Sequence, residues 1–293
     1  MTFEIANQDL TVTVSEDGAE LQEIRDAAGT QYLWSGDAAY WCDRAPNLFP
    51  YVARLPEGRY FLDGEEHFMR IHGIAPYRRF RRIAQDATHL TLALHSDEQT
   101  LAEYPRAFVF RVCYALAGKR LDVTYEVENP DERTMYFGLG GHPGFRVPLV
   151  EGKRFEDYCL RFAQPCSPKR VGFTPDCFVT GEDEPFALRN GSELPLRHEL
   201  FDDDAIVLRD MAHEVTLQSD DAHAVTVRYP QMRYLGIWHR PKTDAPYVCI
   251  EPWLSLPAHA GQKAVLEQQE DLVALAPGKI YRNSWSIEIH NRA

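Results

Sequence analysis

Apolar and polar residues alternate along most of the chain, and this period of two is typical of half-buried β-strands. Residues 10–14 alternate leucine and valine with threonine. Residues 108–116 and 121–127 alternate in the same way on either side of Ala117-Gly-Lys119. This last pattern predicts two antiparallel strands joined by a tight turn.

Turn-forming residues separate the expected strands. Asp63-Gly64 lies between residues 58–62 and 65–69 and predicts a type I′ hairpin, because both central residues of that turn need positive φ. Residues 31–34 predict an aromatic strand. Later apolar runs predict six further strands, at residues 205–208, 213–217, 224–228, 234–238, 247–250 and 285–289.

This spacing indicates an all-β fold, and specifically a large antiparallel β-sandwich with few short helices. Residues 96–104 are the best short helix, with Ser96 as its N-cap and Pro105 ending it. Residues 151–200 are rich in proline and charge, and we expect long excursions from the sandwich there. No repeat or linker divides the sequence, so we expect a single domain over residues 1–293.

Composition excludes several classes of partner. With 293 residues, 44% of them hydrophobic, the chain can bury a sizeable core. A net charge of −13 argues against nucleic acid and anionic membranes. No apolar run approaches the ~20 residues of a membrane helix, and no signal peptide is visible. Six scattered cysteines without Cys-x-x-Cys spacing suit reduced thiols, so we expect a cytoplasmic protein. Oligomeric state does not follow from the sequence.

One histidine lies in a glycine-rich segment, Tyr136-Phe-Gly-Leu-Gly-Gly-His-Pro-Gly-Phe145. Gly140 and Gly141 allow a ligand or another backbone to approach closely. Pro143 favours an extended conformation at His142. The segment can aim the imidazole into a concavity, although a hydrogen-bonded histidine at a strand end has the same pattern.

Three other stretches carry ionisable side chains in unusual places. Glu251 ends an apolar run, where a carboxylate is costly unless it lines a cleft or is paired. Trp253 beside it offers a stacking face for a sugar. Arg54 ends another apolar run, and His72 precedes a glycine. A surface arginine and a solvated turn histidine are the ordinary alternatives for these two.

Together these stretches resemble the aldose 1-epimerase (galactose mutarotase-like) superfamily, and specifically its LacX-like branch. They follow the family's order along nearly the whole chain: Gly18-Ala-Glu-Leu21, Tyr32-Leu-Trp34, Tyr40-Trp41, Asn47-Leu-Phe-Pro50, His72-Gly-Ile-Ala75, Gly140-Gly-His-Pro143, Leu235-Gly-Ile-Trp238 and Cys249-Ile-Glu-Pro-Trp253. The resemblance implies a twisted supersandwich with a sugar site in a cleft on one sheet. It also implies an isomerase that interconverts the α and β anomers of an aldose.

By this resemblance Glu251 removes the proton of the anomeric hydroxyl and His142 protonates the ring oxygen. Arg54 and His72 line the pocket and hold the ring oxygen or neighbouring hydroxyls. We expect His142 and Glu251 to face each other with room for a pyranose between them. Both proton transfers need groups that titrate not far from neutral pH, which a histidine and a partly buried carboxylate satisfy. No cofactor and no metal ion is expected.

The sequence departs from the family in two places. Pro76 stands where the branch usually has arginine, and Arg78 is a candidate replacement. The aspartate that binds sugar hydroxyls in galactose mutarotases has no clear counterpart, with Asp203 and Asp204 as candidates.

Three alternative functions remain at this stage. The basic run at residues 78–82 keeps hexose 6-phosphates as a second substrate class, because phosphate needs a cationic site. A carbohydrate-binding protein on the same fold needs no matched acid and base, so the presence of both His142 and Glu251 favours catalysis. A glycoside hydrolase usually uses two carboxylates, and only one strong candidate is visible.

Overall fold

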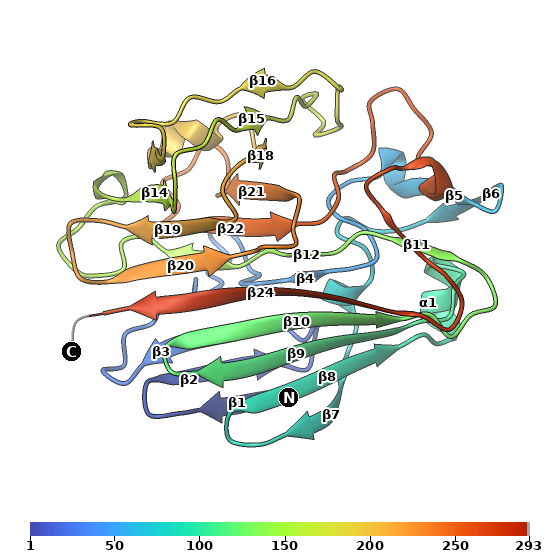
Figure 1. The fold of residues 1–293 in the computed structure, drawn as a ribbon, viewed down its shortest axis with the longest axis horizontal. Helices are drawn as coiled ribbons and strands as arrows, with labels where there is room; N and C mark the ends of the chain where they lie inside the picture. The colour runs from blue at the N-terminus through green and yellow to red at the C-terminus, as the bar shows by residue number, and fades with distance from the viewer. Residues whose placement is uncertain (292–293) are drawn as a thin grey trace.

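The computed structural model describes residues 1–291, which form two large antiparallel sheets and three small ones (Figure 1). The two large sheets pack face to face. The hydroxyl of Tyr125 in one sheet donates to Oδ1 of Asn47 in the other, at 2.9 Å. A Cβ on Gly141 would lie only 2.5 Å from the Trp285 ring across the interface, so a glycine is needed there. The expected antiparallel β-sandwich is therefore confirmed.

The first large sheet has nine strands. In spatial order they are β17 (Glu193–Pro195), β14 (Cys159–Phe162), β19 (Glu214–Gln218), β20 (Ala224–Arg228), β24 (Ile280–His290), β10 (Arg120–Glu128), β9 (Val109–Ala117), β8 (His89–His95) and β7 (Arg81–Gln85). The pair predicted around Ala117-Gly-Lys119 is β9 and β10, with Leu116 opposite Leu121.

The second large sheet has eight strands. Along its main path lie β16 (Glu184–Pro185), β15 (Lys169–Arg170), β18 (Ile206–Arg209), β21 (Tyr234–Trp238), β22 (Tyr247–Trp253), β12 (Gly140–Gly141) and β4 (Asn47–Leu48), and β13 (Gly144–Arg146) also pairs with β22. Residues 151–200 supply β14 to β17, the two outermost strands at one end of each large sheet. These excursions therefore end as short strands at the margins of the sandwich.

The small sheets surround this sandwich. They are β1 (Thr2–Ala6) with β2 (Leu10–Ser15) and β3 (Leu21–Asp26), β5 (Arg59–Leu62) with β6 (Glu65–Phe68), and β11 (Met135–Phe137) with β23 (Val273–Leu275). Between β5 and β6, φ is 55° at Asp63 and 81° at Gly64, which confirms the predicted hairpin turn.

Helical structure is sparse, as expected. The one α-helix within residues 1–291 is α1 (Glu98–Glu103), and the 3₁₀ turns are η1 (Pro56–Gly58), η2 (Ala75–Tyr77), η3 (Phe155–Asp157), η4 (His198–Phe201) and η5 (Leu266–Gln268). Among these residues no helix has the length and apolar character needed to cross a membrane.

Two local predictions were wrong. Asp97, not Ser96, caps α1 by accepting from the Thr100 amide, while the Ser96 hydroxyl accepts from the Phe108 amide instead. Residues 31–34 do not form a continuous strand, because Gln31 and Leu33 make isolated bridges to different segments. Burial of the aromatic side chains in this stretch, and not a strand ladder, explains its apolar pattern.

Candidate active site

Strand β22 runs through the middle of the eight-stranded sheet and is buried along its whole length. Val248 and Ile250 belong to the main apolar core. Because successive side chains of a strand point to opposite faces, Cys249 and Glu251 point away from that core. The strand thus holds a carboxylate, only 1% exposed, on the outer face of the sheet.

The histidine of the glycine-rich segment lies directly beside this carboxylate. Gly140 pairs with Trp253, and Gly144 pairs with Cys249, so His142 falls opposite Glu251. Nε2 of His142 lies 3.1 Å from Oε2 of Glu251. The sandwich therefore brings together an imidazole and a carboxyl group that are 109 positions apart in the chain, and both are buried.

Burial shifts the proton affinities of this pair in opposite directions. It raises the pKa of Glu251 well above its ordinary value, and the nearby charge of Asp204 adds to the rise. It lowers the pKa of His142 well below its ordinary value, with a further contribution from His72. Both shifts favour the neutral forms, so the carboxylate–imidazolium form is a minor state of the pair. In that state the carboxylate is a stronger base and the imidazolium a stronger acid than usual. The pair is therefore suited to exchange protons with a bound molecule.

His72 lies edge-to-face against His142, with ring centroids 5.3 Å apart. The backbone amide of Ala53 donates to Nδ1 of His72 at 3.2 Å, which places the proton of a neutral His72 on Nε2. Burial, and secondly the charge of Arg54, lower the pKa of His72 to about 4. His72 is thus a neutral hydrogen-bond donor at neutral pH.

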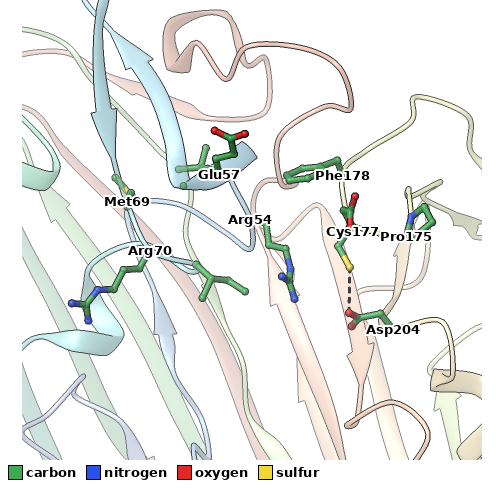
Figure 2. Close-up of a pocket in the computed structure, with 12 residues that line it drawn as sticks. Arg54, Glu57, Met69, Arg70, Pro175, Cys177, Phe178 and Asp204 are labelled. Carbon is green, nitrogen blue, oxygen red and sulfur yellow. Dashed lines mark hydrogen bonds between the residues drawn. The ribbon is translucent and has the colours of Figure 1, made fainter.

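The structure also holds a cavity of about 460 Å³, whose wall includes Arg54 and Asp204 but not His72, His142 or Glu251 (Figure 2). Its wall comprises Arg54, Leu55, Glu57, Gly58, Met69, Arg70, Ile71, Pro175, Asp176, Cys177, Phe178 and Asp204. Arg54 lies in the segment after β4 and Asp204 in the segment before β18, so the two charges reach the cavity from different loops. The charge of Arg54 lowers the pKa of His72, and the charge of Asp204 raises the pKa of Glu251. These two residues of the cavity wall are therefore near enough to act electrostatically on the buried groups.

The backbone around the cavity is strained. His72, Cys177 and Asp204 have φ of 64°, 65° and 77°, a region that residues with a side chain rarely adopt. Such strain collects where a side chain must be held in a particular direction, at binding and catalytic sites above all. The Cys177 thiol donates to Oδ2 of Asp204 at 3.2 Å and fixes this carboxylate in the wall (Figure 2).

Comparison with known proteins agrees with this arrangement. The family model described as aldose 1-epimerase matches residues 1–288. The chain belongs to the aldose 1-epimerase family. It is 32% identical over 305 aligned positions to the chromosomal protein LacX of Lactococcus lactis subsp. lactis, covering 99% of this chain and 100% of the relative.

Two solved structures share this family fold over nearly the whole chain. The galactose mutarotase related enzyme of Lactobacillus acidophilus has a TM-score of 0.94 at 30% identity, covering 99% of this chain and 98% of that one. A galactose mutarotase-like protein of Lactobacillus casei has a TM-score of 0.92 at 30% identity, covering 99% and 100%. The LacX-like branch and the mutarotase fold expected from the sequence are thus confirmed.

The structure changes the expected relation within the acid–base pair. His142 and Glu251 do lie on one face of one sheet. The expected gap for a pyranose between them is wrong, because they are in direct contact at 3.1 Å.

Trp253 does not offer the expected stacking face. Its side chain is 4% exposed and packs in an apolar cluster with Leu48, Val207 and Leu256. Alternation along β22 puts it on the same face as Glu251, but neighbouring strands cover it. Its indole is close to the carboxyl group and tends to lower the Glu251 pKa.

Two tryptophans that had been noted only as family motifs lie beside the catalytic candidates instead. The Trp41 ring is 4.9 Å from the His142 ring, and the Trp238 ring is 5.8 Å from it. Both are partly exposed. Sequence reasoning missed them because aromatic residues are common in any core, and only their place beside His142 distinguishes them.

The basic run at residues 78–82 and the two candidate aspartates differ in their distance from the cavity. Arg78 forms an ion pair with Glu103, and Arg79 with Asp17. The basic run therefore lies around the edge strand β7, away from the cavity wall. Of the two aspartates, Asp204 lines the cavity, whereas Asp203 is exposed outside it.

Proposed function

We propose that this protein is an isomerase of the aldose 1-epimerase type, which interconverts the α and β anomers of a free aldose. The single observation that carries the proposal is the buried contact between His142 and Glu251, 3.1 Å apart. Asp204, in the wall of a cavity of sugar size, is near enough for its charge to raise the pKa of Glu251. Ligand pockets usually measure about 300–1,000 Å³. A protein that only binds a sugar gains nothing from a buried acid–base pair, which is costly to keep.

The ionisable groups supply each step of the reaction. The Glu251 carboxylate accepts the proton of the C1 hydroxyl, the bond between C1 and the ring oxygen breaks, and the His142 imidazolium protonates that oxygen. The open aldehyde rotates about C1–C2 and closes by the reverse steps. One proton is taken and one is given, and no electrons are transferred, so the chemistry calls for no redox cofactor.

The other residues bind and orient the sugar. The Arg54 guanidinium has only hydrogen-bond donors, and it donates to hydroxyls or the ring oxygen. The Asp204 carboxylate accepts from hydroxyls, and His72 donates from Nε2. Trp41 and Trp238 supply the apolar faces first assigned to Trp253, against which the C–H groups of a pyranose pack.

Charge in the cavity favours a free aldose over a sugar phosphate. Arg54 and Arg70 line it together with Glu57, Asp176 and Asp204, so acidic groups outnumber basic ones. A phosphate dianion would meet those carboxylates, and Arg78 is already paired with Glu103.

Anomer exchange measured by saturation-transfer NMR, over a panel of aldoses and aldose 6-phosphates, tests the proposal. We expect at least one free aldose to exchange faster with the protein, and no acceleration with Glu251→Gln. Glu65→Gln, at an exposed position, is the control and should behave as wild type. If anomer exchange is accelerated only for aldose 6-phosphates, the substrate class is sugar phosphates and not free aldoses. If calorimetry shows that a sugar binds but no sugar shows faster anomer exchange, the protein is a carbohydrate-binding protein and not an isomerase.

A further inference from the structure

Three different metal-ligating side chains converge at the buried pair. Cys249 and Glu251 are two positions apart on β22 and share a face, and His142 lies opposite Glu251 on the neighbouring segment. One donor atom from each of the three lies within 4.8 Å of the others. The sequence shows no spaced metal motif here, because the donors come from two strands that only the sheet brings together.

The donor set is that of a transition-metal site. Imidazole nitrogen, thiolate sulfur and carboxylate oxygen are the three ligand types of protein-bound zinc, and three protein ligands with an open fourth position are common. With metal–ligand distances of about 2.0–2.3 Å, tetrahedral donors stand about 3.3–3.8 Å apart. The His142–Glu251 separation of 3.1 Å and the 4.8 Å limit for the trio need only small side-chain shifts to meet this.

Two of the three residues carry buried polar atoms that lack a well-formed hydrogen bond among the described residues. These atoms are Nδ1 of His142 and Oε2 of Glu251, and the latter has its 3.1 Å contact with Nε2 of His142. The His142 residue is 8% exposed and Glu251 is 1% exposed, so bulk water does not satisfy them. Unsatisfied buried polar atoms are expensive, and a bound ion would offer the carboxyl oxygen a partner.

We propose that His142, Cys249 and Glu251 form a binding site for a divalent transition-metal ion such as Zn²⁺, which inhibits the protein by occupying its acid and base. Binding requires the thiol to lose its proton, after which the thiolate and the carboxylate neutralise the ion and the imidazole completes the trio. Inhibition rests on the proposed function, whereas metal binding does not.

Cd²⁺ is the probe, since a thiolate bound to it absorbs in the near ultraviolet. Chelator-treated full-length protein should bind one equivalent and develop this absorption. Cys249→Ser should abolish it, and Cys113→Ser, which removes a partly buried thiol from β9 in the other sheet, should leave it unchanged. Unchanged absorption in Cys249→Ser would overturn the proposal.

Two further variants cover the case in which Cys249→Ser fails to fold. Calorimetry with Zn²⁺ should show affinity lowered by more than about 100-fold in His142→Gln and in Glu251→Gln, since even outer partners of a metal ligand contribute about 10–100-fold. Wild-type affinity in both would again overturn the site.

Inhibition by the bound ion is measured separately, by anomer exchange. Saturating Zn²⁺ should stop anomer exchange on the best sugar of the panel, and a chelator should restore it. Persistent exchange at full occupancy would refute the inhibition. If no sugar exchanges with metal-free protein, the proposed function fails, while the Cd²⁺ result still decides the metal site.

Discussion

The Cys177 thiol donates a hydrogen bond to the Asp204 carboxylate, with Sγ and Oδ2 3.2 Å apart in the cavity wall. Burial, followed by the charge of Asp204, raises the pKa of the thiol to about 11. The thiol therefore remains a protonated donor at neutral pH and can hold Asp204 in one orientation. This makes Cys177 a positioning residue for a carboxylate that lines the cavity.

Cys177→Ala should raise KM for the best sugar by about 2- to 12-fold, the range set by the net worth of one hydrogen bond, about 0.5–1.5 kcal/mol. We expect kcat to change little, because the pair His142–Glu251 is untouched. Cys177→Ser keeps a donor and should restore KM towards wild type. If serine and alanine behave alike in exchange kinetics, the hydrogen bond does not position Asp204.

Asp204→Asn should shift the pH dependence of kcat. The negative charge of Asp204 raises the pKa of Glu251, so removing this charge should lower that pKa. Glu251 must be ionised to act as the base, and activity falls as the pH drops through its pKa. The acidic limb should therefore move to lower pH in Asp204→Asn. Asp203→Asn, at the exposed neighbour, is the control, and an unmoved limb in Asp204→Asn would contradict the coupling.

Arg54→Ala should weaken sugar binding by about 10- to 100-fold, as expected for a hydrogen bond to a charged group worth about 1.5–3 kcal/mol. The same change should raise the pKa of His72 above about 4, because the arginine charge helps to depress it. Calorimetry and histidine NMR titration measure the two effects. Arg70→Ala, which removes another arginine of the cavity wall, should leave the pKa of His72 unchanged. A large drop in the melting temperature of Arg54→Ala would show that the arginine is structural.

Glu251→Gln should lower anomer exchange by about 10²–10⁴-fold, the usual contribution of a general base, while sugar binding largely survives. His142→Asn should have a similar effect through loss of the acid. The losses should not multiply in the double variant, because both groups serve one proton relay. Saturation-transfer NMR measures all three proteins. Near-normal anomer exchange in Glu251→Gln would show that Glu251 is not the base.

Local sequence patterns predicted much of the architecture. Alternation identified β9, β10 and most strands of the second half, since a half-buried strand needs apolar residues every second position. Asp63-Gly64 predicted its turn correctly because few dipeptides accept positive φ twice. The organisation as a single domain over residues 1–293 and the roles of Arg54, His72, His142, Glu251 and Trp253 stay predictions.

By itself, the sequence determined which residues share a face of each strand, and it singled out His142 and Glu251 by the glycines and prolines around them. Only the tertiary structure decided which strands are neighbours. That choice put His142 in contact with Glu251 and near Cys249, buried Trp253, and placed Asp204 and Cys177 in the cavity wall. The reason is physical: a period of two orients side chains along one strand, whereas pairing between strands depends on backbone hydrogen bonds and packing between segments far apart in the chain.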